Sequence, residues 1–221
     1  MEDKDSIDEI ARRIAEETGG FTGGPVHRFG EMGRFALDSL KQNGLDKSSY
    51  VLDVGCGALR IGYWLVRYLD ADRYCGIEPQ TPHLEAGIRH ALGPELAAEK
   101  RPRFDPGEDF DFSVFGVKFD FVVARSIFSH ASPQMVRRAM ESFRDNSSGR
   151  GVMLASYKQT RDDDGDAEVV DVNGRGKEWS WRRYAPSYLQ GLARECGLTA
   201  DDFGKRYNGQ VWLRVSKPQP G

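Results

Sequence analysis

The sequence has few cysteines and no long hydrophobic run, and each absence excludes a class of protein. Its three cysteines, Cys56, Cys75 and Cys196, are an odd set that does not suit a disulfide framework. They indicate reduced thiols, so we expect a cytoplasmic protein. The amino-terminal residues are charged and no apolar stretch reaches the length of a membrane span. We therefore expect neither a signal peptide nor a transmembrane helix.

The sequence also lacks an excess of charge of either sign. Lys and Arg total 31 against 34 Asp and Glu, a net charge of -3, which disfavours general affinity for nucleic acid or for an anionic membrane. Three of the four histidines, His27, His83 and His90, are scattered without metal-ligand spacing, so we expect no required metal. The expected partner is a small molecule, and a homodimer is left open.

The amino-terminal part of the chain reads as two helices joined by a glycine-rich connector. Ser6 and Glu9 form a capping box ahead of one apolar stripe, and a second stripe covers residues 32–40. We interpret residues 1–45 as a helical segment ahead of the main domain. It either forms a lid over a binding site or packs on the edge of a sheet.

The remaining residues, 46–221, alternate between strands and helices. Strands are predicted at residues 50–54, 74–78, 103–105, 119–124, 151–157, 198–203 and 210–215. Thr81-Pro82 and Ser132-Pro133 begin helices, and Gly93-Pro94 ends the first of them. An insertion around residues 158–184 contains a hairpin that turns at Asn173-Gly174. The fold class is α/β: a doubly wound, mostly parallel, seven-stranded sheet with helices on both faces and a terminal antiparallel strand pair.

The most informative stretch is the turn after the first predicted strand, Asp53-x-Gly55-x-Gly57. Gly55 and Gly57 allow the backbone to turn sharply and to approach a ligand where a Cβ atom would collide. Apolar residues at helical spacing follow from Ile61 onward. The sequence therefore predicts a nucleotide-type cradle, which does not by itself identify the nucleotide.

This turn, an acid at the end of the second strand and the final antiparallel pair resemble the class I S-adenosylmethionine-dependent methyltransferases. The resemblance covers roughly residues 48–215 and implies a Rossmann-like fold, S-adenosyl-L-methionine as the cofactor and methyl transfer as the activity. One position departs from the family pattern: Leu59 stands where many members have a third glycine.

The resemblance also implies a role for individual residues. Gly55, Cys56 and Gly57 would face the methionine and ribose of the cofactor, and Asp53 would orient its amino group. Glu78, followed by Pro79, would accept hydrogen bonds from the ribose hydroxyls. Asp109 and Phe110 would lie at the adenine, and Ala124, Arg125 and Ser126 would line the methionine side. For Glu78 and for the acids around Asp109, a solvated surface position is the alternative.

On the acceptor side, His130 follows the fourth strand at the reactive edge of the sheet. It is either a catalytic base or a residue that positions substrate or braces its loop. Tyr157, Trp179, Trp181 and Arg183 would wall an aromatic or sugar-like acceptor with an anionic group. The alternative is that the tryptophans form one face of a strand and the arginine is solvated.

Three functions remain open from the sequence. The first is S-adenosylmethionine-dependent methyl transfer to the oxygen or nitrogen of a small molecule. The second is a cofactor-binding sensor or interaction protein without catalysis. The third, an NAD-dependent oxidoreductase, is disfavoured because Ala58, Leu59 and Arg60 follow Gly57, so that the G-x-G-x-x-G fingerprint fails at its third glycine.

Overall fold

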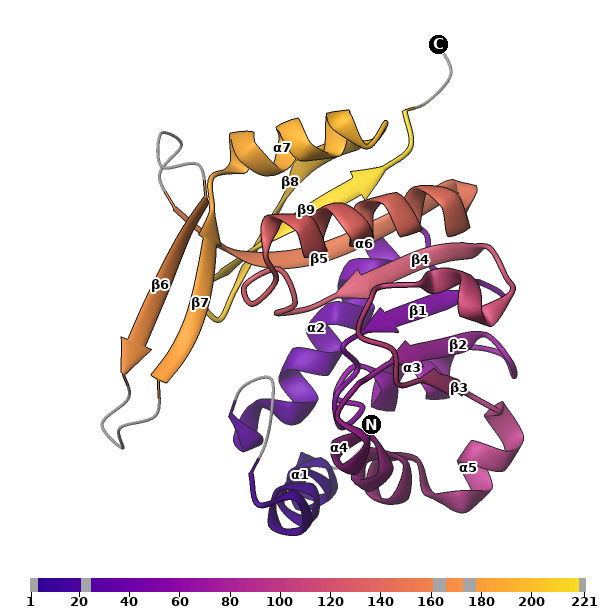
Figure 1. Ribbon diagram of the computed structural model, residues 1–221. Helices are drawn as coiled ribbons and strands as arrows, with labels where there is room; N and C mark the ends of the chain where they lie inside the picture. Colours follow the sequence, from indigo (N-terminus) through magenta and orange to yellow (C-terminus); the bar gives the residue numbers. More distant parts are fainter. Residues whose placement is uncertain (1–3, 21–24, 161–165, 173–177, 219–221) are drawn as a thin grey trace. The chain divides into compact units, whose positions relative to one another are not determined.

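The computed structural model describes residues 4–20, 25–160, 166–172 and 178–218 (Figure 1). The chain divides into two compact units. The first comprises Met1–Glu108 and Val114–Phe121, and the second comprises Asp109–Ser113 and Val122–Gly221. Strand β4 (Phe119–Ala124) contributes residues to both.

The first unit is built on three parallel strands, β1 (Val51–Val54), β2 (Tyr74–Ile77) and β3 (Arg103–Asp105). Every residue of β1 and β2 is buried, as expected for central parallel strands. Because Val54 pairs with Ile77, β1 and β2 end at the same level. The residues that follow these two strands therefore lie next to each other.

The helices of the first unit follow the predicted order, with two differences. They are α1 (Lys4–Thr18), η1 (Val26–Arg28), α2 (Phe29–Gln42), α3 (Gly62–Tyr68), α4 (Thr81–Gly87), a π-helical turn η2 (Ile88–Leu92) and α5 (Gly93–Lys100). Helix α1 begins before Ser6, so the predicted capping box is wrong: Ser6 lies inside the helix. Gly93, with φ 73°, ends the helical stretch that begins at Thr81, as predicted, but this stretch closes in a π-helical turn and Pro94 then starts another helix.

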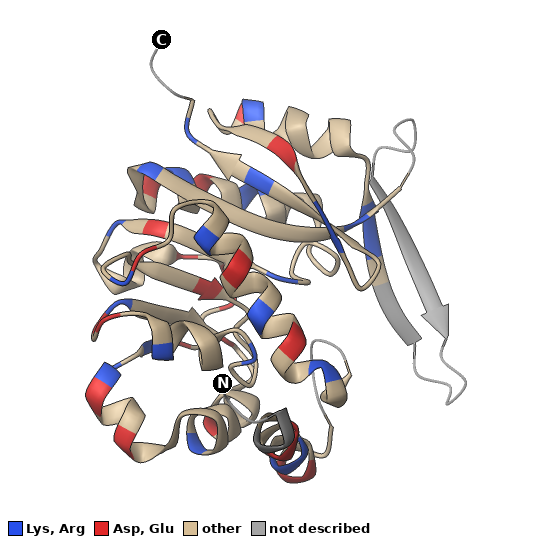
Figure 2. Ribbon diagram, turned by 180° about the vertical axis from the view of Figure 1, so that it is seen from behind, with Lys and Arg blue, Asp and Glu red and all other residues tan. Residues whose placement is uncertain are grey.

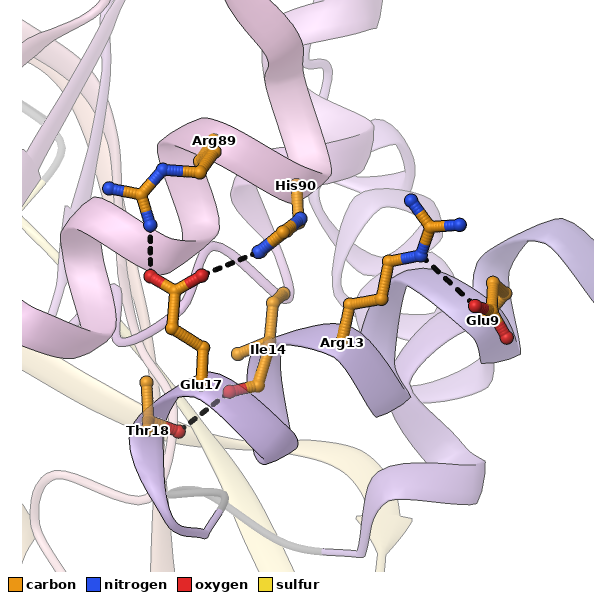
Figure 3. Close-up of polar contacts among 7 residues, drawn as sticks. All are labelled: Glu9, Arg13, Ile14, Glu17, Thr18, Arg89 and His90. Atoms are coloured by element: carbon orange, nitrogen blue, oxygen red, sulfur yellow. Dashed lines mark hydrogen bonds and ion pairs between the residues drawn. The ribbon is translucent and has the colours of Figure 1, made fainter.

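Glu17, near the end of α1, joins this helix to the segment that follows β2 (Figure 3). Its carboxylate forms an ion pair with Arg89 and bonds to His90 Nε2 at 2.7 Å. Helix α1 also packs against α4 and η2. The hydrogen bonds from His90 and then Arg89 hold the pKa of Glu17 below its usual value. These contacts tie the amino-terminal helix to the rest of its unit.

Replacing Glu17 with glutamine is expected to loosen α1. Because folding lowers the pKa of Glu17, its stabilisation is present above the carboxyl pKa of the unfolded chain and is lost as the pH falls through the lower folded value. Hydrogen exchange of the α1 amides at neutral pH should be about two- to threefold faster in Glu17→Gln, the modest size expected of an exposed ion pair. The neighbouring exposed Glu16→Gln is the control. Equal exchange in the two variants would contradict this role for Glu17.

The second unit contains the remaining helices and strands. They are η3 (Phe112–Phe115), α6 (Pro133–Asn146), β5 (Ser147–Gln159), β6 (Asp166–Val172), β7 (Glu178–Tyr184), α7 (Pro186–Glu195), β8 (Thr199–Tyr207) and β9 (Gln210–Ser216); η3 runs into the first unit. Strand β5 pairs antiparallel with β9 and parallel with β7. The Ser132 side chain caps α6 by accepting from the Met135 N–H at 3.3 Å, which confirms the predicted helix start.

The predicted fold class is confirmed as α/β with parallel strands, helices and a terminal antiparallel pair, β8 with β9. The described residues form nine strands: the seven predicted ones and the two of the predicted hairpin, β6 and β7. The hairpin turn at Asn173-Gly174 lies outside the described residues. Within the described part of the chain, no helix is long and apolar enough to cross a membrane.

Candidate functional site

The turn after β1 is held by hydrogen bonds to the end of β2. The Gly55 and Cys56 N–H groups both donate to the Ile77 carbonyl oxygen, at 2.8 and 3.0 Å. Gly55 has φ 67° and Gly57 has φ 54°, the left-handed region that glycine adopts without strain. The turn is therefore tied to the end of β2, and glycine suits both positions because it adopts their backbone conformation without strain.

Glu78, the first residue after β2, closes this turn with its side chain. Its Oε2 accepts from the Gly57 N–H at 2.7 Å, and its Oε1 accepts from the Gln80 N–H at 2.8 Å. The residue is only 6% exposed. Since each carboxylate oxygen has two lone pairs, both oxygens retain the capacity to accept one further hydrogen bond. Glu78 is thus a buried acid that supports the turn and can still bind a hydroxyl-bearing ligand.

Asp53 lies inside the first unit rather than on an open surface. It is 1% exposed, and its Oδ2 accepts from the Tyr74 hydroxyl at 2.9 Å. Burial and the charge of Asp53 raise the pKa of Tyr74, which keeps the phenol protonated as a donor. This contact orients the Asp53 carboxylate. Its proposed role at the amino group of a cofactor stays a prediction.

Leu59 shows how the chain accommodates its departure from the family pattern. Its φ is 61°, in the left-handed region, although its side chain is fully buried. Its N–H donates to the Cys56 carbonyl oxygen at 2.9 Å. The backbone therefore takes the conformation that glycine favours, at a cost of about 1–2 kcal/mol for a residue with a Cβ atom. Leu59 therefore replaces glycine in side chain but keeps a left-handed backbone conformation that glycine also adopts.

The other two predicted cofactor residues of the first unit differ in exposure. Cys56 is buried, and burial followed by the charges of Asp53 and Glu78 raises its pKa well above the usual value. Its thiol is therefore neutral and not a nucleophile. Pro79 is exposed at the start of the segment leading to α4.

The predicted adenine-side and methionine-side residues lie in the second unit. Asp109 is exposed, and its Oδ1 accepts from the Asp111 N–H at 3.3 Å, a local turn contact. Phe110 is 9% exposed with φ 60°. Ala124 ends β4 and is buried, whereas Arg125 and Ser126 are half-buried in the loop that follows.

His130 is exposed in the same loop, and its ring contacts a tryptophan of the hairpin in a tilted arrangement. Its ring centroid is 4.6 Å from that of Trp181, with an interplanar angle of 38°. On the same indole, Lys158 Nζ lies 3.4 Å from the ring centroid. The loop is fastened to β7 because the Tyr184 hydroxyl donates to the Ala131 carbonyl oxygen at 2.6 Å. The structure thus brings His130 and Trp181 into contact, which the sequence alone does not predict.

The four predicted acceptor residues have different environments. Tyr157 is 1% exposed and belongs to the core of the second unit, so it is not available as an open wall. Trp181 is half-buried and Arg183 is exposed. The side chain of Trp179 lies outside the described residues. Lys158, which the sequence interpretation did not include, is the register partner of Arg183 in the β5–β7 pair. Only the pairing of these strands reveals it.

No group of three His, Cys, Asp or Glu side chains is placed to hold a metal ion in the described ranges.

Comparison with known proteins identifies the domain. Residues 52–153, from β1 into β5, match the family model described as a methyltransferase domain. No curated protein matches the chain in sequence.

Solved structures of methyltransferases share the fold of the chain. The glycopeptide N-methyltransferase MtfA complexed with S-adenosyl-L-methionine superimposes with a TM-score of 0.64 at 16% identity, over 86% of this chain and 94% of that one. The DhpI–SAH complex has a TM-score of 0.63 at 15% identity and covers 98% of both chains. The CcbJ methyltransferase from Streptomyces caelestis has a TM-score of 0.61 at 15% identity, over 95% of this chain and 98% of that one. Residues 52–153 of this chain therefore match a methyltransferase domain, and the chain shares the fold of solved methyltransferases.

Proposed function

We propose that the chain transfers the methyl group of S-adenosyl-L-methionine to an oxygen or nitrogen nucleophile of a small molecule. The observation that carries this proposal is the turn after β1, where the buried carboxylate of Glu78 meets the Gly57 N–H at 2.7 Å within a methyltransferase domain. The turn fits the cofactor because its two glycines carry no Cβ atom that would keep a ligand from the backbone, and because Glu78 has lone pairs left for two hydroxyl groups.

In this proposal the turn residues hold the donor. Glu78 accepts from the ribose hydroxyls, Asp53 orients the amino group, and Gly55, Cys56, Gly57 and Pro79 line the donor. Asp109 and Phe110 contact the adenine, and residues 124–126 contact the methionine end. When bound, S-adenosyl-L-methionine would supply an activated methyl group, to whose carbon the acceptor would bond in line as the C–S bond breaks and its electrons leave with the sulfur of S-adenosylhomocysteine. The chain contributes alignment and exclusion of water.

The hairpin and the His130 loop take the acceptor. Lys158 and Arg183 are register partners on parallel strands, so their side chains leave the same face, and Lys158 Nζ already lies over Trp181. An acceptor with a planar ring and an anionic group fits this pair of cations and the indole. His130, exposed and 4.6 Å from Trp181, takes the proton from the nucleophile or positions it.

Charge and thiol chemistry support the remaining parts of the proposal. Glu31, Arg34, Asp38 and Lys41 alternate in sign along α2 (Figure 2), a mixed surface that favours a small acceptor over nucleic acid. The three cysteines are free and buried, in keeping with a reducing, cytoplasmic compartment.

Residues 1–45 would act as a covering segment that Glu17 holds in place. A cofactor-binding protein without catalysis is the second candidate, because the same turn would serve both.

Binding measurements test whether the donor is S-adenosyl-L-methionine and distinguish the proposed methyltransferase from an NAD-dependent oxidoreductase. Calorimetry is expected to give micromolar or tighter binding of S-adenosylmethionine and S-adenosylhomocysteine, and NAD binding at least tenfold weaker. The reverse preference would refute the proposal. A panel of aromatic acids bearing hydroxyl or amino groups, analysed for the mass of one added methyl group, then separates an enzyme from a sensor. Transfer to none of a wide panel by a protein that binds the donor would favour the sensor.

A further inference from the structure

Three polar side chains from separate segments of the second unit close a ring of hydrogen bonds at Ser126. The Gln210 Nε2 donates to the Ser126 Oγ at 2.7 Å. The Ser156 hydroxyl donates to the Gln210 Oε1 at 2.5 Å, and the Ser126 N–H donates to the Ser156 Oγ at 2.8 Å. The ring therefore joins the loop after β4 to the carboxyl-terminal half of β5 and to the first residue of β9.

This ring is buried and surrounds a strained residue. Ser156 is fully buried and Gln210 is 6% exposed, so polar groups at these positions need the partners that they have. Ser126 has φ 61°, a conformation that a residue with a Cβ atom adopts only when its surroundings enforce it. Both the backbone N–H and the side-chain Oγ of Ser126 are held by the ring. The ring therefore holds Ser126 at two points while its backbone is in the left-handed conformation.

Further hydrogen bonds connect Ser126 to the rest of its loop. The Ser129 hydroxyl donates to the Ser126 carbonyl oxygen at 3.0 Å, and the Ser129 carbonyl oxygen accepts from the Arg182 N–H at 2.8 Å. His130 follows directly. The path of the loop from Ser126 to His130 thus depends on the ring at one end and on β7 at the other.

We propose that Gln210 is a positioning residue of the donor site, acting through Ser126. It holds Ser126 in the left-handed conformation, so that the adjoining residues Ala124 and Arg125 are presented to the donor in one arrangement. This inference rests on the proposed function, which assigns that loop to the methionine end of the donor. Gln210 lies 84 residues from Ser126 in the sequence, and only the fold brings them together.

The test compares the binding of S-adenosylhomocysteine to purified variants by calorimetry. Gln210→Leu keeps the size of the side chain and removes both hydrogen bonds, and it is expected to weaken binding about tenfold, or roughly 1.4 kcal/mol. In a Ser126→Gly background the same substitution should weaken binding less than threefold, because glycine adopts the left-handed conformation unaided. A general packing defect would not be rescued by glycine. Gln190→Leu on α7 is the matched control.

Two results would overturn the inference: Gln210→Leu binding as tightly as wild type, or an undiminished tenfold loss in the Ser126→Gly background. Ser156→Ala should show the same loss and the same rescue, and it carries the test if Gln210→Leu does not fold. If wild type binds no S-adenosylhomocysteine, the proposed function fails. The positioning role is then judged by hydrogen exchange over residues 125–131, where an unchanged rate in Gln210→Leu rejects it.

Discussion

Gly33→Ala is expected to destabilise the protein by about 3 kcal/mol, at the upper end of the cost of overpacking. A Cβ atom on Gly33 would lie 2.2 Å from the Arg60 carbonyl oxygen and 2.5 Å from Trp64 Cδ1. Helix α2 therefore rests with its backbone directly on the segment between the glycine turn and α3. Alanine must push α2 away or displace Arg60, which follows the turn closely in sequence. The thermal midpoint should fall by roughly 6–12 °C.

Gly191→Ala in α7 is the matched control, since it makes the same substitution inside another helix. The nearest atom to a Cβ there is Arg194 Nη2 at 3.9 Å, so nothing needs to move. Alanine should stabilise this helix by about 0.5–1 kcal/mol through its higher helix propensity. Thermal unfolding of the two variants should shift the midpoint in opposite directions. A Gly33→Ala midpoint at or above that of wild type would show that α2 does not approach Arg60 as closely as described.

Glu78→Gln is expected to weaken the binding of S-adenosylhomocysteine about 100-fold, or roughly 2.7 kcal/mol. The substitution preserves size, but both carboxylate oxygens accept from backbone N–H groups, those of Gly57 and Gln80. An amide has a single oxygen, so its NH2 group must face one of these donors. The turn then loses a hydrogen bond and leaves a donor unsatisfied, which should also lower stability by about 1–3 kcal/mol. Ligand hydroxyls lose a charged acceptor as well.

Glu85→Gln on α4 is the control for Glu78, because it makes the same change on the exposed side of the following helix. Calorimetry should find its affinity for S-adenosylhomocysteine within twofold of wild type. Equal affinities for Glu78→Gln and Glu85→Gln would remove Glu78 from the donor site. A loss of stability in Glu78→Gln without a loss of affinity would assign Glu78 to the support of the turn alone.

The turn was readable from the sequence because its chemistry is local. Asp53, Gly55 and Gly57 lie within five residues of one another. Glu78 follows the next buried strand, so parallel pairing places it beside them. The glycine conformations follow from the same pattern, and the structure bears them out. The left-handed Phe110 and Leu59, both buried, carry no such signal, because nothing in a leucine or phenylalanine marks a positive φ.

The acceptor side was harder to predict because its residues are assembled from distant strands. Trp181 and His130 were each singled out, but their ring contact depends on β7 docking its backbone on the Ser129 carbonyl oxygen. The sequence predicts Tyr157 as part of an open wall, but the residue is 1% exposed, because alternation within a strand does not tell which face the neighbouring elements cover. Lys158 and Gln210 gave no signal at all, as lone polar residues at strand ends usually are solvated.

The order of strands and helices, the final antiparallel pair and the glycine turn were therefore determined by the sequence itself, through local periodicity and turn chemistry. The tertiary structure decided which buried polar groups meet: Glu78 with the turn amides, Asp53 with Tyr74, and Gln210 with Ser126. The physical reason is the distance along the chain over which each kind of information acts. Periodicity reports the burial of a residue within its own element, whereas a hydrogen bond between elements depends on register and packing that no single segment encodes.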